Sequence, residues 1–501
     1  MTERGPYYIL SLDQGTTSTR AFLFDADGAP MRLRQKELSQ SYPQDGWVEH
    51  DPDEIWSATL EVARGCLAHG TDAKSVAAIG ITNQRETVVV WERASGRPLG
   101  PAIVWQDRRT ADFCAALKAE GFEDEIRART GLLADPYFSG TKIAWALDRY
   151  DGARAGAEKG EVCVGTVDSW LIYKLTGGRV HATDATNASR TMLFNIHTQD
   201  WDDTLLQRLD VPRACLPEVK DSGADFGTTA DEVFGRPIPI AGVAGDQQAA
   251  TVGQACFARG MLKSTYGTGC FAVLNTGATA VASENRLLTT VAYRLAGEVT
   301  YALEGSIFMA GAIVQWLRDE MGLIARAEDS EALAAKANPR SSAVLVPAFT
   351  GLGAPHWRPD VRAALFGLTR DTGKAEICRA ALESVSLQTR DLMQAMADDM
   401  AREGLPAPNA LRVDGGMVAN DWFAQNLADL LALDVERPQI TETTALGAAL
   451  MAGLQIGFYD GLDAIAARWR LERGFSPIMS EAERDGRTAR WQAAVSRLLA
   501  E

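Results

Sequence analysis

The stretch LDQGTTSTR, residues 12–20, lies between the apolar runs YYIL before it and AFLFD after it. Both runs are rich in residues that favour strands, and the short polar connection between them predicts a β-hairpin. Gly15 allows a tight turn, and the hydroxyl and N–H groups of Thr16, Thr17 and Ser18 can point into one concavity that suits phosphate oxygens. Taken alone, this turn also fits an ordinary hairpin whose polar side chains bond to nearby N–H groups.

Strand and helix patterns alternate after this hairpin. Residues 51–67 predict a helix, with Asp51 as its cap and Pro52 in its first turn. Residues 75–81 and 87–92 predict strands, and the polar stretch TNQRE lies between them. Because strand ends carry the sites of α/β proteins, this stretch is a candidate for chemistry.

The second half of the chain repeats the opening pattern. GMLKSTYGTGCFAVLN, residues 260–275, is again an apolar run, a Thr/Gly turn and an apolar run, and LRVDGGMVAN precedes a helix that Asn420 should cap. We therefore predict a duplicated α/β domain, with domains 1–252 and 253–501. The length of 501 residues fits two or more domains, and the lack of a Pro- or Ser-rich linker favours closely apposed halves.

Composition narrows the function classes. The net charge of −16, with acids and bases mixed along the chain, argues against a nucleic-acid surface or an anionic membrane as partner. The 7 scattered cysteines form no CxxC pair, and the 5 histidines form no zinc pattern. No run of about 18 apolar residues occurs. We expect a cytoplasmic protein with reduced thiols and no membrane insertion.

Ten stretches, taken together and in order, are similar to motifs of the FGGY carbohydrate kinases, a branch of the actin, Hsp70 and sugar kinase superfamily. They are LDQGTTSTR, ITNQRETVVVWE, IVWQDRRT, LLADPYFSGTKIAW, TDATNASRT, AGVAGDQQAA, STYGTGCF, GLGAPHW, RVDGGMVAN and TALGAA. The resemblance covers nearly the whole chain, and within the family it is strongest to the kinases that act on glycerol. It implies an α/β fold of two duplicated actin-like (ribonuclease H-like) domains with an ATP cleft between them, and a homodimer or homotetramer.

The resemblance also implies a polyol site. Its implied members are Arg85, Glu86, Trp105, Tyr137, Asp246, Gln247 and Phe271. Hydroxyl groups need both donors and acceptors, which an arginine beside a carboxylate supplies, while aromatic rings cover the C–H face. Asp246 matches the family's catalytic aspartate, which orients the attacking hydroxyl and takes its proton.

For ATP and Mg²⁺ the resemblance implies a second set of residues. The nucleotide set is Thr16, Thr17, Ser18, Arg20, Thr268, Gly269, Gly311, Gln315, Gly416 and Asn420, and the metal set is Asp13, acting through a water, and Asp246. Thr16 and Arg20 approach the transferring phosphoryl group in this scheme. Arg20 supplies local positive charge that a protein of net charge −16 does not supply globally.

The expected reaction is ATP-dependent phosphorylation of glycerol to sn-glycerol 3-phosphate by in-line transfer. One alternative is an FGGY kinase for another small polyol or ketose, since one altered pocket residue shifts preference by a modest factor. An alternative from a different class is an actin-like or chaperone-like ATPase. The region before Asp246 carries Arg236 but few glycines, which departs from the pattern of kinases regulated by fructose 1,6-bisphosphate.

Overall fold

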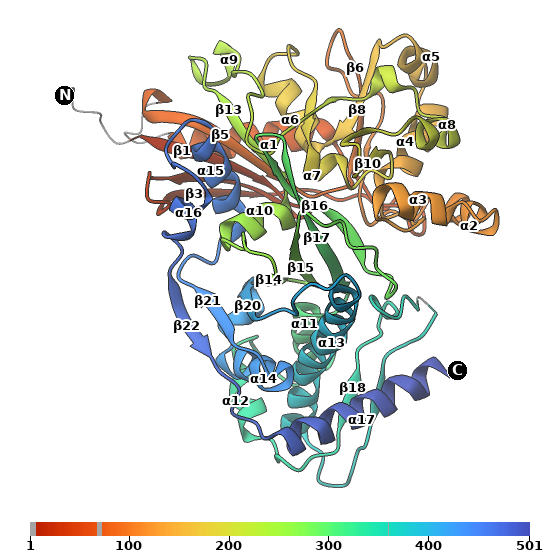
Figure 1. The fold of residues 1–501 in the computed structure, drawn as a ribbon, viewed down its shortest axis with the longest axis vertical. Coiled ribbons are helices and arrows are strands. Elements are labelled where there is room, and N and C mark those ends of the chain that lie inside the picture. Colours follow the sequence, from red (N-terminus) through yellow and green to blue (C-terminus); the bar gives the residue numbers. More distant parts are fainter. Residues whose placement is uncertain (1–6, 68–72, 359, 501) are drawn as a thin grey trace.

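The structure is a computed structural model that describes residues 7–67, 73–358 and 360–500. The chain forms two bodies, one from the first half of the sequence and one from the second, with the strands and helices of both halves meeting between them (Figure 1). Across the described residues, no helix combines the length and apolar character needed to cross a bilayer.

The first body is built on a five-stranded sheet of order β13-β5-β1-β2-β3. Its strands are β1 (Tyr8–Gln14), β2 (Ser18–Phe24), β3 (Pro30–Glu37), β5 (Val76–Asn83) and β13 (Ile240–Gly245). The hairpin predicted around residues 12–20 is confirmed as β1 and β2, which pair antiparallel. β3 extends the antiparallel part, whereas β5 and β13 add parallel strands on the other side.

The second body is built on a seven-stranded sheet of order β16-β17-β15-β14-β20-β21-β22. Its strands are β14 (Met261–Tyr266), β15 (Cys270–Gly277), β16 (Leu288–Leu295), β17 (Glu298–Ile307), β20 (Ala410–Asp414), β21 (Val435–Pro438) and β22 (Leu471–Phe475). Without its edge strands β16 and β22, this sheet has the order and strand directions of the first one. The predicted duplication of an α/β unit is therefore confirmed.

Helices cover these sheets, and the remaining short strands of the described chain form one four-stranded and three two-stranded sheets. The helices are α1 (Pro52–Leu67), α2 (Ala111–Ala119), α3 (Glu123–Thr130), α4 (Ser139–Arg149), α5 (Ala153–Glu158), α6 (Val167–Leu175), α7 (Ala185–Ala188), α8 (Asp203–Leu209), α9 (Asp231–Phe234), α10 (Asp246–Gly253), α11 (Gly311–Asp319), α12 (Asp329–Lys336), α13 (Lys374–Arg402), α14 (Asp421–Leu431), α15 (Thr443–Gln455), α16 (Leu462–Ala466) and α17 (Glu481–Leu499). The minor strands are β4 (Glu49–His50), β6 (Val88–Glu92), β7 (Ala102–Ile103), β8 (Val162–Thr166), β9 (Ala182–Asp184), β10 (Phe194–Asn195), β11 (Asp200–Trp201), β12 (Glu218–Lys220), β18 (Val344–Val346) and β19 (Ala364–Phe366).

The two halves meet on α10 and α15, which follow the last parallel strand of each sheet and pack on one another. A Cβ atom on Gly447 would lie 1.8 Å from the carbonyl oxygen of Ala249, so only glycine lets these backbones approach so closely. α15 also packs on β5 and β13 of the first sheet. The division into 1–252 and 253–501 stays a prediction, and residue 252 lies in the last turn of α10.

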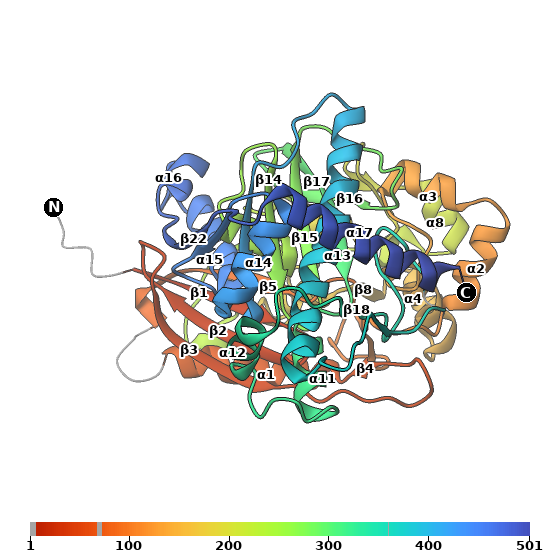
Figure 2. The ribbon, with the colours of Figure 1, turned by 90° about the horizontal axis from the view of Figure 1, so that it is seen from below.

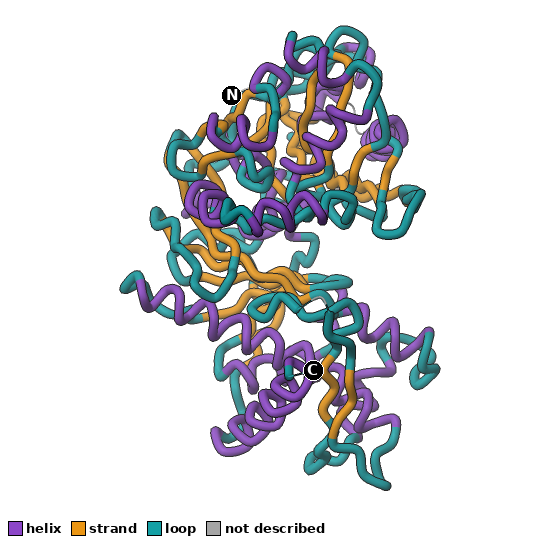
Figure 3. Tube along the Cα trace, turned by 90° about the vertical axis from the view of Figure 1, so that its right-hand side faces the viewer, coloured by secondary structure: helices purple, strands orange, loops and turns teal. Residues whose placement is uncertain are grey.

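A second contact between the halves comes from β16 and β17. Leu288, Val291 and Tyr301 on these strands are buried in one hydrophobic cluster with first-half residues such as Ile126 and Phe138. Figure 3 shows strands running through the region where the two bodies meet. This packing brings the middle of β17 to the end of the first sheet.

The C-terminal segment is the helix that its charged amphipathic pattern predicts. α17 packs on β18 and α14 and crosses α13 on the outside of the second body (Figure 2). Trp491 is buried, and its indole N–H donates to Asp391 on α13 at 2.7 Å. One face of this helix is therefore part of the core.

Candidate active site

Arg85 and Asp246 meet because their strands are neighbours in the first sheet. Arg85 follows β5 and Asp246 follows β13, and the two strands pair in parallel, with Gly245 opposite Asn83. Arg85 Nε lies 3.1 Å from Asp246 Oδ1. The Asp246 side chain is 34% exposed and that of Arg85 only 2%. An accessible carboxylate thus borders a buried guanidinium.

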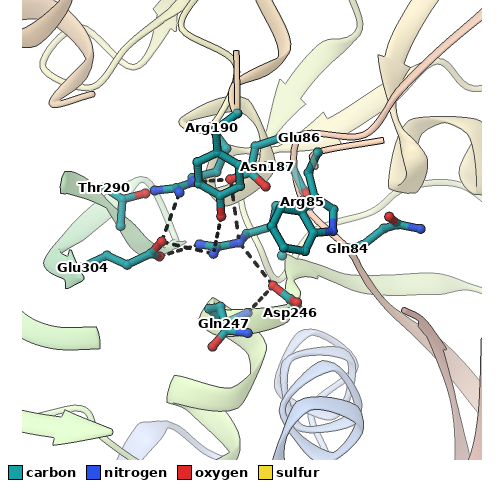
Figure 4. A network of polar contacts seen from close by, with 12 residues as sticks. Gln84, Arg85, Glu86, Asn187, Arg190, Asp246, Gln247, Thr290 and Glu304 are labelled. Carbon is teal, nitrogen blue, oxygen red and sulfur yellow. Dashed lines mark hydrogen bonds and ion pairs between the residues drawn. The ribbon is translucent and has the colours of Figure 1, made fainter. Parts of the chain in front are cut away.

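The Arg85 guanidinium is held from the opposite side by Glu304, which lies on β17 of the second body (Figure 4). Arg85 Nη1 donates to Glu304 Oε2 at 2.5 Å, and Nη2 donates to Oε1 at 3.1 Å. Burial alone would raise the pKa of Glu304, but Arg190 and Arg85 lower it to about 2. Glu304 is therefore a permanent negative charge at neutral pH.

Glu86 is the second member of the arginine and carboxylate pair. Arg190 Nε donates to Glu86 Oε1 at 2.6 Å, and the Glu86 backbone has a φ of 61°, which is uncommon for a residue other than glycine. Burial raises the pKa of Glu86, and the two arginines oppose that shift. Within the described part of the chain, Glu86 Oε2 makes no hydrogen bond, which leaves it open to a hydroxyl donor.

Three aromatic rings lie beside these charges. The ring of Trp105 contacts those of Tyr137 and Phe271 edge to face, with centroids 5.6 and 6.5 Å apart. The guanidinium of Arg85 lies 5.8 Å from the Phe271 centroid, and its Nη2 lies 3.4 Å from the Tyr137 hydroxyl. A connected set of contacts therefore joins six of the residues predicted for the polyol site, namely Arg85, Glu86, Trp105, Tyr137, Asp246 and Phe271.

Gln247, also predicted for the polyol site, is oriented by a buried lysine. Lys263 Nζ donates to Gln247 Oε1 at 2.5 Å and to Thr265 Oγ1 at 2.9 Å. Because an ammonium group only donates, the amide oxygen of Gln247 must face Lys263, which leaves the amide NH₂ available as a donor.

The first phosphate-binding candidate is the turn between β1 and β2. Gly15 N donates to Ser18 O at 3.0 Å and closes the turn, and the Thr16 hydroxyl accepts a hydrogen bond from Trp105 Nε1 at 2.9 Å. Thr17 is exposed, whereas Thr16 and Ser18 are half-buried. The indole of Trp105 thus connects the hydroxyl turn to the aromatic wall of the polyol site.

Arg20 bridges two carboxylates beside this turn. Its terminal nitrogens lie 2.5 Å from Asp13 Oδ2 and 2.7 Å from Glu442 Oε2. Burial raises the pKa of Asp13, and the positive charge of Arg20 opposes that shift. Arg20 is 28% exposed, so its guanidinium also borders open space.

The second phosphate-binding candidate faces a cavity of about 360 Å³ in the second body. The predicted residues that line this cavity are Thr268, Gly311, Gln315, Gly416 and Asn420, while Gly269 lies next to it in the same loop. Ala310 N and Ala312 N donate to Thr268 O, so this loop is packed on the first turn of α11. A helix N-terminus beside a loop of this kind favours bound anions.

Asn420 is the N-cap of α14, as its position in the sequence predicts. Its Oδ1 accepts from Phe423 N at 2.9 Å, and its Nδ2 donates to Ser330 Oγ at 3.2 Å. The amide is therefore engaged within the protein, and Asn420 forms part of the cavity wall. Gly416 is exposed at the same wall.

Comparisons with known proteins agree with this arrangement. The FGGY family of carbohydrate kinases matches the chain twice, with its N-terminal domain over residues 8–253 and its C-terminal domain over residues 262–456. The chain belongs to the FGGY family of carbohydrate kinases. It is 61% identical over 494 residues to a glycerol kinase of Bradyrhizobium sp. (strain ORS 278), covering 98% of this chain and 99% of that protein. It is 60% identical over 496 residues to glycerol kinase 1 of Pseudomonas aeruginosa, covering 99% of both.

Solved structures show the same fold for this FGGY kinase. The crystal structure of Plasmodium falciparum glycerol kinase with ADP matches with a TM-score of 0.92 and 36% identity, covering 99% of this chain and 98% of that one. Gluconate kinase from Lactobacillus acidophilus matches with a TM-score of 0.87 at 21% identity, covering 99% of this chain and 98% of that one. The second likeness concerns the fold alone.

The donor set of this FGGY kinase fits a magnesium ion that is shared with a nucleotide. The described residues contain no group of three or more His, Cys, Asp or Glu side chains arranged to hold a metal ion. Mg²⁺ in kinases is commonly held by one or two carboxylates together with substrate phosphates and waters. Asp13 lies near the end of β1, Asp246 directly follows β13, and the negative charge of Asp246 contributes to the raised pKa of Asp13. Two neighbouring carboxylates of this kind fit that pattern.

Sequence reasoning missed Arg190, Glu304 and Lys263, although all three are buried beside the predicted polyol residues. Arg190 lies in the TDATNASRT stretch, so its presence there was a signal that could have been followed. Glu304 and Lys263 lie inside strands β17 and β14 and outside the motifs that carry the family resemblance. Only the pairing of the two bodies reveals their place.

Proposed function

We propose that this FGGY kinase transfers the γ-phosphoryl group of ATP to glycerol and forms sn-glycerol 3-phosphate and ADP. The observation that carries the proposal is the set of Arg85, Glu86 and Asp246 beside a wall of aromatic rings, adjoining the hydroxyl turn of β1 and β2. The full-length similarity to proteins named glycerol kinase supports the same substrate.

The polyol end supplies both hydrogen-bonding roles that glycerol needs. Arg85 and the Gln247 amide NH₂ donate to glycerol oxygens, and Glu86 Oε2 accepts from a hydroxyl. Trp105 and Phe271 cover the C–H edge. The three-carbon substrate is thus held in one orientation, which presents a terminal hydroxyl to Asp246.

Asp246 is the proposed base. Its carboxylate orients the terminal hydroxyl of glycerol and takes its proton while the new O–P bond forms and the bond from the γ-phosphorus to the bridging oxygen of ADP breaks. Since phosphoryl transfer passes through a loose transition state in most descriptions, alignment and charge stabilisation contribute more than base strength.

The phosphate end stabilises the transferred group. Thr16, Thr17 and Ser18 offer hydroxyl and N–H donors from the first body, Arg20 offers positive charge, and Thr268 with Gly269 offers donors from the second body. Asp13, through a water, and Asp246 would hold Mg²⁺, which neutralises developing negative charge on the phosphate oxygens when it is bound.

The test is coupled ADP release by the purified protein with Mg-ATP and glycerol, erythritol, xylitol, dihydroxyacetone or no acceptor. We expect release that depends strongly on glycerol and that falls by a factor of roughly 10³ in Asp246→Asn. Release of equal rate without an acceptor would place the protein among conformational ATPases. Preference for a longer polyol would keep the mechanism and change the substrate. The oligomeric state stays a prediction: light scattering should give the mass of a homodimer or a homotetramer.

A further inference from the structure

We propose that Arg190 and Glu304 are positioning residues of the polyol site: together they set the distance and orientation between the Arg85 donor and the Glu86 acceptor, and Glu304 does so from the second body. This inference rests on the proposed polyol kinase function. We call Arg85, Glu86, Arg190 and Glu304 the charged cluster.

The geometry of Glu304 explains how Arg85 is oriented. Both oxygens of the Glu304 carboxylate accept from the two terminal nitrogens of Arg85, so the plane of the guanidinium is set by a forked contact. The remaining nitrogen, Nε, is the one that faces Asp246 at 3.1 Å. Without Glu304 the terminal nitrogens would keep, among the described residues, only the longer contacts, of 3.4 Å each, to Gln248 Oε1 and the Tyr137 hydroxyl, and the guanidinium could turn toward Asp246, the proposed base.

Arg190 connects the two members of the polyol pair. Its Nε donates to Glu86 Oε1 at 2.6 Å, and its Nη2 donates to Glu304 Oε1 at 3.0 Å. The rigid guanidinium of Arg190 therefore connects Glu86, the proposed acceptor for glycerol, with Glu304, which holds the proposed donor Arg85. In Figure 4 these contacts form a continuous chain from Glu86 through Arg190 and Glu304 to Arg85 and Asp246.

Burial favours a role beyond stability. The four residues of the charged cluster are 0–3% exposed, and buried ion pairs commonly contribute less to stability than apolar residues of the same volume. Arg190 Nη1 is buried and finds no partner within the described residues, which adds a further cost. A cluster kept only for stability would gain from apolar replacement, whereas a cluster that orients a substrate would not.

Position in the fold links the cluster to both halves. Glu304 lies on β17 between β15 and β16, opposite Val273 and Leu288, whereas the other three members come from the first half of the chain. The Ser189 hydroxyl, next to Arg190, bonds to Thr290 on β16 at 3.0 Å. The polyol pair is therefore oriented correctly only while the β16–β17 region stays packed on the first body.

The experiment compares Glu304→Gln, Arg190→Met and the double variant, using glycerol and ATP kinetics and thermal unfolding. The double variant keeps the net charge of the cluster, because it removes one positive and one negative group. A matched control is Asp221→Asn, which removes another ion pair between the halves, to Arg294 Nε at 2.5 Å, outside the charged cluster.

We expect Glu304→Gln to raise the KM for glycerol at least 30-fold while the KM for ATP changes less than threefold. In the double variant Tm should return toward the wild-type value while the glycerol KM stays at least 30-fold raised. Asp221→Asn should keep the wild-type glycerol KM. Recovery of both Tm and glycerol KM in the double variant would overturn the proposal, because charge balance alone would then suffice.

Failure of the proposed function has a different signature. If the wild-type protein prefers another polyol, the same variants are measured with that polyol and the inference stands or falls on its KM. If the wild-type protein releases ADP without any acceptor, there is no polyol pair to position and both proposals are overturned.

Discussion

The two ends of the proposed site are built in different ways. The polyol end rests on the charged cluster, whose members are buried and are joined by short ion pairs. The nucleotide end is an open cavity of about 360 Å³ whose lining includes three glycines, Thr268 and the exposed Gln315, together with the charged residues Arg318, Glu328 and Glu331. A small neutral polyol brings few groups of its own, so its site must be oriented in advance, whereas ATP brings charge and surface that can order a looser site.

The sharpest way to break the polyol end is Arg85→Met. This change removes the arginine that contacts Glu304, Glu86 and Asp246 together, and it leaves Arg190 as the one remaining cation of the charged cluster. Breaking a buried pair commonly costs about 3–5 kcal/mol. We expect kcat/KM for glycerol to fall roughly 10³-fold and ATP affinity to change less than threefold, as measured by steady-state kinetics and calorimetry.

Its control is Arg109→Met. Arg109 has a side chain only 1% exposed and pairs with Asp107 and Glu49, away from the charged cluster. This variant should lose stability without a selective loss for glycerol. An equal loss in both variants would mean that unfolding, and not the polyol end, explains the effect.

A second way to sharpen the comparison is the pH dependence of stability. Burial lowers the pKa of Lys142, which donates to the Tyr137 carbonyl at 2.8 Å, to about 8. Below pH 8 Lys142 is charged in both the folded and the unfolded chain. The free-energy cost of burying this charge then lowers the unfolding free energy in full. Between about pH 8 and 10 the folded chain loses its proton first, and the unfolding free energy should rise by about 3 kcal/mol from this group.

Lys142→Met should remove that rise. The measurement is chemical denaturation of wild type and variant at several pH values from 7 to 10, taking the difference between the two proteins. As the pH rises above 8, the unfolding free energy of the wild type should rise relative to that of Lys142→Met. If the difference in unfolding free energy between the two proteins stays constant from pH 7 to 10, Lys142 is not a charge whose burial destabilises the fold.

The phosphate loop of the nucleotide end should be sensitive to the space around its backbone. In Gly311→Ala the new Cβ would lie 2.6 Å from the carbonyl oxygen of Gly267 and would push on the phosphate loop. We expect the ATP Kd to rise roughly tenfold with a glycerol KM within twofold of wild type. Gly474→Ala, whose Cβ has 3.8 Å of room, should leave both constants unchanged. A change confined to the glycerol KM would reverse the comparison.

The smallest expected effect concerns the link between the two ends. Trp105→Phe keeps an aromatic ring over the polyol and removes the indole N–H that donates to Thr16. Since one hydrogen bond contributes about 0.5–1.5 kcal/mol, kcat should fall about three- to tenfold with little change in glycerol KM. Trp201→Phe removes a comparable bond to Pro217 elsewhere and should leave kcat unchanged.

Local patterns predicted much of the fold for reasons that the structure makes plain. The hairpin of β1 and β2, helix α1 after Asp51 and the capping of α14 by Asn420 all depend on neighbours in sequence, namely strand propensity, turn residues and cap hydrogen bonds. The duplication was also readable, because each half opens with the same order of apolar run, hydroxyl turn and apolar run.

The sequence predicted the polyol residues only through a set of motifs taken together. It did not predict the residues that hold them in place. Arg85 and Glu304 are 219 positions apart, and the glutamate stands in an apolar strand with no neighbour that would suggest an ion pair. Lys263 directly precedes the STYGTGCF motif without being part of it, yet it orients Gln247.

The amino-acid sequence by itself determined the family and the duplication of the α/β unit, and it predicted the residues proposed to bind phosphate and polyol, because these depend on short motifs in a fixed order. Only the tertiary structure decided that Glu304 from the second body completes the charged cluster around Arg85. The physical reason is that a buried charge pairs with the opposite charge that lies nearest to it in space. Glu304 comes near Arg85 and Arg190 because β17 packs on the first body, and no spacing along the chain indicates this.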